Sequence, residues 1–197
     1  VTCQSPGQVM AELAAAFRLA KTDRHGPCIV DIPIDLQSAS LDDQGISNLI
    51  KISEPERQPS YNGLNQESLT ELTHALQQAE APLLWLGNGL RRLPRETLKD
   101  LIDSLGIPYL TSWTATDLVD PIDRLYAGHA GTYGGRAGNL ILQSCDVLLC
   151  IGTRLAIPQK GYVDDELARR AEIFVVDCDQ VELDKLGPRF NYKYRAD

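Results

Sequence analysis

The segment between residues 126 and 154 constrains the fold more than any other part of the chain. It begins with a glycine-rich stretch, YAGHAGTYGGRAGN, runs into a helical pattern near residues 137–144, and ends in the apolar run 147–151, which a Gly-Thr-Arg triplet follows. A glycine-rich loop that opens a helix and leads to an apolar strand is the layout of a parallel α/β nucleotide site. Glycines allow the backbone to approach a ligand, and the free N–H groups at a helix start favour an anion.

Apolar runs alternate with helical patterns through the rest of the second half of the chain. The runs that predict strands are 83–87, 107–111, 147–151 and 173–176, and the predicted helices are 65–79, 94–105, 137–144, 164–171 and 181–186. Strands that are apolar along their whole length are typical of parallel sheets covered on both faces. The sequence therefore predicts right-handed βαβ units in an α/β, doubly wound parallel sheet, a Rossmann-like three-layer α/β/α domain.

The first sixty residues have a different organisation. Helical spacing of apolar residues predicts a helix over 6–23, and the apolar run 28–33 predicts a short buried strand that Pro33 ends. Residues 41–62 are polar and contain prolines, which is typical of a linker. We therefore expect three parts: the C-terminal piece of a preceding domain (1–40), a linker (41–62) and a nucleotide-binding-like domain (63–197). Because residue 1 is Val, we expect a fragment of a longer chain.

Charge and composition exclude several classes of function. The formal net charge is -8 and the pI is about 4.9, which argues against nucleic acid as a partner, since phosphate binding needs clustered Lys and Arg. No apolar run approaches the roughly 20 residues of a membrane span, and no signal peptide is visible. The five cysteines lack the spacing of a metal site and indicate reduced thiols in a cytoplasmic protein.

Four segments follow predicted strands, where an open parallel sheet binds its ligands. They are residues 87–92 (GNGLRR), 111–115 (TSWTA), 152–154 (GTR) and 175–179 (VVDCD). Each has two interpretations. The glycine pair is either a ligand loop or a tight turn, and Trp113 either packs or stacks on a ligand. Arg154 either grips a phosphate or pairs with a core carboxylate. Asp179 either binds ribose hydroxyls or caps the next helix.

His129 is the histidine of the glycine-rich stretch, and it stands alone. No Ser or Cys lies beside it with a partner base, and a single His of this kind is more often structural than catalytic. The sequence has no GxSxG, Walker A or HExxH motif. It therefore gives no support to Ser/His/Asp chemistry.

The ordered set of segments resembles the thiamine-diphosphate enzymes of the acetolactate synthase group. Residues 26–37 (GPCIVDIPIDLQ) are similar to the end of that family's pyrimidine-binding domain. Residues 81–89, 107–112, 128–139 with 145–154, and 175–179 are similar to successive blocks of its central domain. The resemblance covers essentially the whole chain, in order. It places the family's catalytic glutamate before residue 1 and its diphosphate and magnesium motif after residue 197.

The resemblance implies a function for the whole protein and a role for this part of it. The whole enzyme would act on a pyruvate-like 2-keto acid with thiamine diphosphate and Mg²⁺, as a decarboxylase or carboligase, and would form a homodimer or homotetramer. No catalytic residue and no metal ligand would lie in this chain. The central domain holds FAD in the nearest relatives, and the resemblance carries that role onto Gly87, Asn88, Gly89, Thr111, Gly128, His129, Gly152, Arg154, Asp177 and Asp179.

Residues 155–161 depart from the family pattern. Acetolactate synthases continue after Gly-x-Arg with Phe, two Asp and a second Arg, whereas this chain reads LAIPQKG, with Pro158 where that arginine would be. The departure points toward less characterised carboligases and removes a charged contact from a flavin site. Two alternatives therefore stay open: a nucleotide-binding module without catalytic duty, and a scaffolding domain with an empty pocket.

Overall fold

The computed structural model describes residues 1–21, 26–40 and 63–196. These residues fall into two compact units, one within 1–60 and the other within 61–197, and each is considered by itself. The predicted linker, 41–62, lies outside the described residues. Within them, no helix has both the length and the apolar character needed to cross a membrane.

The described residues of the first unit include the helix α1 (Pro6–Lys21) and the short helix α2 (Ile34–Gln37). The strand predicted over 28–33 is wrong. Only Asp31 is paired, through a single bridge to Thr2, and Ile29 is 83% exposed. An extended segment forms a strand only beside another one, and the partner of this segment is the short run of residues 1–3.

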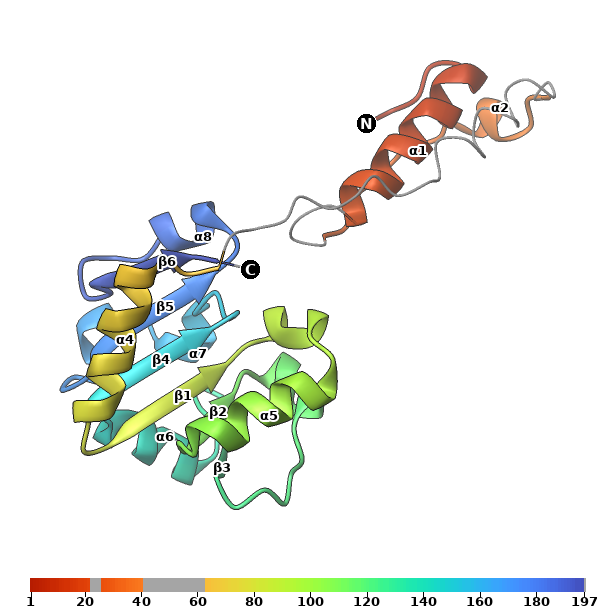
Figure 1. The fold of residues 1–197 in the computed structure, drawn as a ribbon. Coiled ribbons are helices and arrows are strands. Elements are labelled where there is room, and N and C mark those ends of the chain that lie inside the picture. Colours follow the sequence, from red (N-terminus) through yellow and green to blue (C-terminus); the bar gives the residue numbers. More distant parts are fainter. Residues whose placement is uncertain (22–25, 41–62, 197) are drawn as a thin grey trace. The chain divides into compact units, whose positions relative to one another are not determined.

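The second unit is built on a six-stranded sheet in which every pairing is parallel. The strands are β1 (Pro82–Leu86), β2 (Tyr109–Thr111), β3 (Tyr126–His129), β4 (Val147–Ile151), β5 (Glu172–Asp177) and β6 (Tyr192–Arg195). Their order in the sheet is β3-β2-β1-β4-β5-β6, so the chain starts in the middle, winds outward, crosses over and winds outward again. The doubly wound parallel sheet predicted from the sequence is confirmed (Figure 1).

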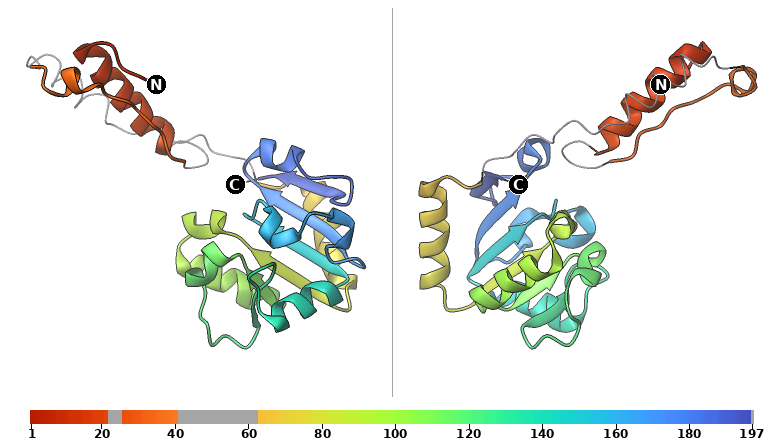
Figure 2. Two further views of the ribbon diagram at one scale, coloured as in Figure 1. Left: turned by 180° about the vertical axis from the view of Figure 1, so that it is seen from behind. Right: turned by 45° about the vertical axis from the view of Figure 1, so that its right-hand side comes forward.

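Helices cover both faces of this sheet. The longer ones are α4 (Gln66–Gln78), α5 (Arg95–Leu105) and α6 (Arg136–Ser144), and the short turns are η1 (Asn88–Arg92), η2 (Trp113–Leu118), α7 (Ile157–Lys160), η3 (Asp164–Glu166) and α8 (Gln180–Asp184). In Figure 1, α4 and α5 lie in front of the sheet and α6 lies behind it, and the turned views of Figure 2 show the three layers.

Two apolar clusters fill the space between the layers. Leu72 of α4 and Ile102 of α5 pack on one face, together with Phe174. Leu142 of α6 packs on the other face, with Trp85. Alternate residues of each strand point to opposite faces, so the continuous apolar runs of β1, β4 and β5 supply both clusters, and this is why these strands read as unbroken apolar segments.

The helix predicted over 164–171 is wrong beyond its first residues, because the structure has only the three-residue turn η3 there. Ala168 adopts a left-handed conformation with φ 42°, which ends a helix. The carbonyl oxygens of Leu167, Ala168 and Ala171 accept hydrogen bonds from Arg189 at 3.4, 2.6 and 2.9 Å. A distant guanidinium thus replaces the amides that a helix would supply.

Candidate functional site

Every residue predicted to bind the cofactor lies at the carboxyl edge of the sheet. Gly87, Asn88 and Gly89 follow β1, and Thr111 is the last residue of β2. Gly128 and His129 end β3, Gly152 and Arg154 follow β4, Asp177 ends β5, and Asp179 begins α8. Because β3 and β5 are four strand spacings apart, these residues extend over about 19 Å, which suits an elongated ligand.

The centre of this edge is the point where the winding of the sheet reverses, between β1 and β4. The loops that follow these strands touch. The amide of Gly87 donates to the carbonyl oxygen of Ile151 at 2.8 Å, and the amide of Gly89 donates to that of Gly152 at 2.9 Å. A Cβ on Gly87 would lie 2.0 Å from the Gly152 oxygen. These glycines therefore permit close contact between the two loops.

Arg154 stands beside this contact, at the surface. It is exposed and makes no hydrogen bond or ion pair with any residue that the structure describes. The next residue, Leu155, is 1% exposed. Its φ of 50° is a backbone conformation that residues other than glycine rarely adopt. The buried leucine anchors the turn, and the guanidinium next to it stays in solvent.

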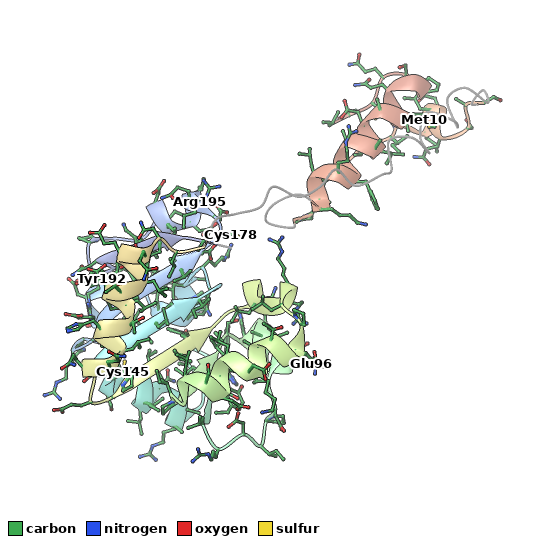
Figure 3. The ribbon with its side chains drawn as sticks, viewed as in Figure 1. Met10, Glu96, Cys145, Cys178, Tyr192 and Arg195 are labelled. Atoms are coloured by element: carbon green, nitrogen blue, oxygen red, sulfur yellow. The ribbon has the colours of Figure 1, made fainter. Side chains whose placement is uncertain are left out.

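Asp177 and Asp179 follow the next strand. Asp177 is 7% exposed, and its carboxylate accepts a hydrogen bond from the amide of Asp179 at 2.9 Å. Asp179 in turn caps α8 by accepting from the amide of Val181 at 2.9 Å. Cys178 stands between Asp177 and Asp179 in the sequence, and Figure 3 shows it close to Arg195. The Nε atom of Arg195 donates to the Cys178 carbonyl oxygen at 3.3 Å. Asp179 therefore caps the next helix, which is one of its two predicted interpretations.

Thr111 is fully buried at the end of β2. Its hydroxyl lies 2.9 Å from that of Tyr126 on the neighbouring strand β3. Tyr126 stacks on Tyr109, whose hydroxyl donates to Asp123 at 3.1 Å. Burial and the nearby Asp123 charge raise the pKa of Tyr109, so it stays a neutral donor. The Thr111 hydroxyl is thus fixed in place by the strand beside it.

The glycine-rich loop after β3 is held by its own polar groups. His129 Nε2 donates to the carbonyl oxygen of Tyr133 at 2.9 Å. The side-chain amide of Asn139 accepts from the amide of Gly131 at 2.9 Å and donates to its carbonyl at 3.2 Å. Gly131 has φ 101°, and a Cβ there would lie 2.4 Å from the Pro158 oxygen. The loop is therefore seated against α7.

An aromatic pair crosses between the loops after β2 and β3. The rings of Trp113 and Tyr133 stack with centroids 5.1 Å apart and planes 11° from parallel. Trp113 is 50% exposed and Tyr133 is 65% exposed. Both line a small, shallow hollow that is open to solvent, to which His129, Ala130, Pro158 and Gln159 also contribute.

Hydrogen bonds from Arg91 hold the turn η2, which carries Trp113, against the turn η1. Arg91 binds both oxygens of Asp117, at 2.8 and 2.6 Å, and donates to the Thr114 carbonyl oxygen at 3.0 Å and to Asn88 Oδ1 at 2.9 Å. The Arg91 hydrogen bond holds the pKa of Asp117 at about 2, below its usual value. Arg95 adds a bond to the Asp117 carbonyl oxygen at 2.9 Å. The turns η1 and η2 thus form one connected rim.

The residues of this edge fit a nucleotide in their chemistry. Arg154, which pairs with no residue that the structure describes, offers a cation for a phosphate, and Asp177 and Asp179 place carboxylates of the kind that bind ribose hydroxyls after the next strand. The backbone at Gly128 is open, because nothing lies within 4 Å of a Cβ placed there. Among the described residues, no group of three or more His, Cys, Asp and Glu is placed to hold a metal ion.

The residues that connect these loops are harder to predict from the sequence. Tyr133 lies inside the glycine-rich stretch, and Arg91 lies inside the segment after β1, yet neither was predicted to matter. Asp117 lies outside all the predicted segments, and Gln159 lies in residues 155–161, which stand out in the sequence only as a departure from the family pattern. A signal existed for Tyr133, because an aromatic residue between glycines has little around it to pack against in its own loop.

Comparisons with known proteins identify relatives of this chain. Residues 69–191 match the family described as "Thiamine pyrophosphate enzyme, central domain". The isozyme 1 large subunit of acetolactate synthase from Escherichia coli is 30% identical over 91% of this chain, and the acetolactate synthase large subunit of Corynebacterium glutamicum is 31% identical over 92%. The chain spans only 30% and 28% of the lengths of these relatives. A probable acetolactate synthase large subunit from Methanocaldococcus jannaschii is 27% identical over 92% of the chain.

Proposed function

The chain belongs to the thiamine pyrophosphate enzyme family, whose central domain it contains, and from this premise we propose that it is the nucleotide-holding part of a 2-keto-acid decarboxylase or carboligase. The whole protein would act on a pyruvate-like substrate and assemble as a homodimer or homotetramer. Thiamine diphosphate, when bound with Mg²⁺, would supply the stabilisation of the carbanion. The role of this chain would be to bind FAD or a related nucleotide along the carboxyl edge.

One observation carries the nucleotide part of the proposal. Arg154 is exposed, pairs with no described residue and stands at the point where the winding reverses, and two carboxylates follow the adjacent strand. Arg154 would bind a phosphate, and Asp177 and Asp179 would bind ribose hydroxyls. These groups lie on neighbouring strands β4 and β5, so one ligand can engage both.

The nucleotide part is tested by the absorption spectrum of the purified chain after excess FAD is added and the free ligand is removed. We expect retained flavin absorption in the wild type and a clear loss in R154Q. R170Q is the matched control, because Arg170 is also an exposed arginine but lies at the start of β5 rather than at the carboxyl edge. Equal retention by R154Q and the wild type would contradict the assignment of Arg154.

The enzymatic part requires the whole protein. With thiamine diphosphate, Mg²⁺ and pyruvate, we expect release of CO₂ with formation of a carboligation product or an aldehyde. A correctly folded whole protein that consumes none of a panel of 2-keto acids would overturn this part.

A scaffolding role is the second candidate, and the contact between the loops after β1 and β4 favours it. The Cβ positions of Gly87 and Gly89 face the backbone of Gly152, so these glycines are explained without any ligand. The same FAD experiment separates the two candidates, since a scaffolding domain retains no flavin.

A further inference from the structure

Two large aromatic side chains are exposed at the edge where the sheet would bind its ligand. Trp113 belongs to η2, after β2, and Tyr133 belongs to the loop between β3 and α6. They stack on each other across the gap between two separate loops, yet half or more of each side chain remains in contact with solvent. Stacking leaves the outer faces of such a pair available to another flat ring.

The hollow beside the pair lacks the groups that would recognise a sugar or an anion. None of the residues that line it is an Asp, Glu, Lys or Arg. The amide of Gln159 is used at both ends, because its oxygen accepts from the Ala156 amide at 3.0 Å and its nitrogen donates to Thr153 Oγ1 at 3.3 Å. His129 Nε2 is used by Tyr133. Aromatic faces and Pro158 remain, which suits a planar, uncharged ring.

The hollow is connected to the proposed phosphate site. Gln159, which lines the hollow, is hydrogen-bonded to Thr153, and Thr153 directly precedes Arg154. The amide of Thr132 also donates to the Pro158 carbonyl oxygen at 2.8 Å, which joins the glycine-rich loop to α7. A ligand with a ring at one end and a phosphate further along can therefore engage both places.

The pair is also held in position before any ligand arrives. Arg91 fixes η2 through Asp117 and Thr114, and His129 fixes the backbone at Tyr133. An aromatic surface fixed in this way loses little conformational entropy on binding.

We propose that Trp113 and Tyr133 form an aromatic shelf that stacks the heteroaromatic ring of the bound nucleotide. The proposal rests on the nucleotide site described under Proposed function and names the part of the ligand that this surface selects. The ring is either flavin or adenine, since both present the same flat face, and the experiment distinguishes them.

Equilibrium dialysis of the 197-residue chain with FAD, FMN and ADP provides the test. From the contribution of a base stacked on an aromatic side chain, we expect W113A and Y133A each to weaken FAD binding by about 5- to 150-fold. W113F and Y133F should recover most of the affinity, because they keep a flat ring. Y162A is the matched control, since Tyr162 is an 88% exposed tyrosine outside the shelf, and its affinity should equal that of the wild type.

Each outcome decides between the proposals. If W113A and Y133A bind FMN more weakly than the wild type but bind ADP equally well, the shelf stacks flavin. If they bind ADP more weakly but FMN equally well, the shelf stacks adenine. FAD binding by W113A and Y133A at the wild-type affinity overturns the shelf and leaves the nucleotide site standing. A wild-type chain that binds none of the three ligands overturns both. The circular dichroism spectrum of each variant must match that of the wild type, and W113F and Y133F provide the comparison if an alanine variant fails to fold.

Discussion

The backbone of Gly87 faces the carbonyl group of Gly152 so closely that a methyl group on Gly87 would lie 2.0 Å from the oxygen and 2.3 Å from the carbon. The two residues follow β1 and β4, the central strands of the sheet. Real Cβ atoms do not approach backbone atoms so closely, so any side chain at residue 87 forces the two loops apart. The contact makes this glycine a requirement of the fold, whatever the site binds.

We expect G87A to lower the free energy of unfolding by about 2 to 3 kcal/mol, since backbone atoms cannot move aside without distorting both loops. G63A is the matched control, because nothing lies within 4 Å of a Cβ at Gly63, and its effect should stay within about 0.5 kcal/mol. Urea unfolding of the two variants measures the difference. Equal urea midpoints for G87A and G63A would show that the two loops can move apart at little cost in stability.

Leu155 combines full burial with a left-handed backbone. We expect L155A to cost about 3 kcal/mol, as is usual for a buried leucine in a packed core. L140A, on α6, removes the same atoms from a side chain that is 59% exposed and should change the stability by less than about 0.5 kcal/mol. Thermal and urea unfolding report both. If L155A were as mild as L140A, the anchoring of the turn beside Arg154 would be wrong.

Arg91 lowers the pKa of Asp117 to about 2. A depressed carboxyl pKa stabilises the folded protein above the unfolded value of about 3.9, and this contribution disappears as the pH falls toward 2. In R91Q the principal hydrogen bond is lost, and the pKa of Asp117 should rise toward its ordinary value. Carboxyl NMR titration of both proteins measures the shift. An unchanged Asp117 pKa in R91Q would mean that another group supplies the effect.

Burial raises the pKa of Cys145 to about 12 and that of Cys150 further still, whereas Cys28 is exposed. Because the thiolate is the reactive form, iodoacetamide at pH 8 should modify Cys28 and spare Cys145 and Cys150. Peptide mass spectrometry identifies the modified sites, and the same reaction in urea should reach all of them. Labelling of Cys150 at the rate of Cys28 in the native protein would contradict its burial.

The central strands of the sheet could be predicted from the sequence because they are apolar along their whole length. β4 begins and ends where its apolar run predicts, and β1 and β5 differ only at their ends. β3 and β6 were missed. β3 contains glycine and histidine and so resembles a loop in sequence, and β6 alternates tyrosine with charged residues at the edge of the sheet. Edge strands carry fewer constraints on hydrophobicity, so a search for apolar runs overlooks them.

The sequence was sufficient to locate the candidate site but not to predict the contacts between its loops. Parallel strands bring their carboxyl ends to one edge, so the order of strands and loops was sufficient to gather Gly87, Gly152 and Asp177 there. Arg91 and Asp117 are 26 residues apart, and no local pattern announces that they meet. Stacking of Trp113 on Tyr133 depends in the same way on the relative placement of two loops, which tertiary structure alone determines.

The position of β1 in the middle of the sheet also determines when the domain can acquire its native structure. β1 pairs with β2 on one side, but its other partner, β4, joins only after a crossover, and Asp146 just before β4 bonds to Glu80 and Ala81, 66 and 65 residues earlier. Pairings of such separation form slowly, because a long loop must close first. During synthesis on the ribosome, a nascent chain ending before residue 146 would expose the unpaired side of β1, an apolar strand edge that can associate with another chain.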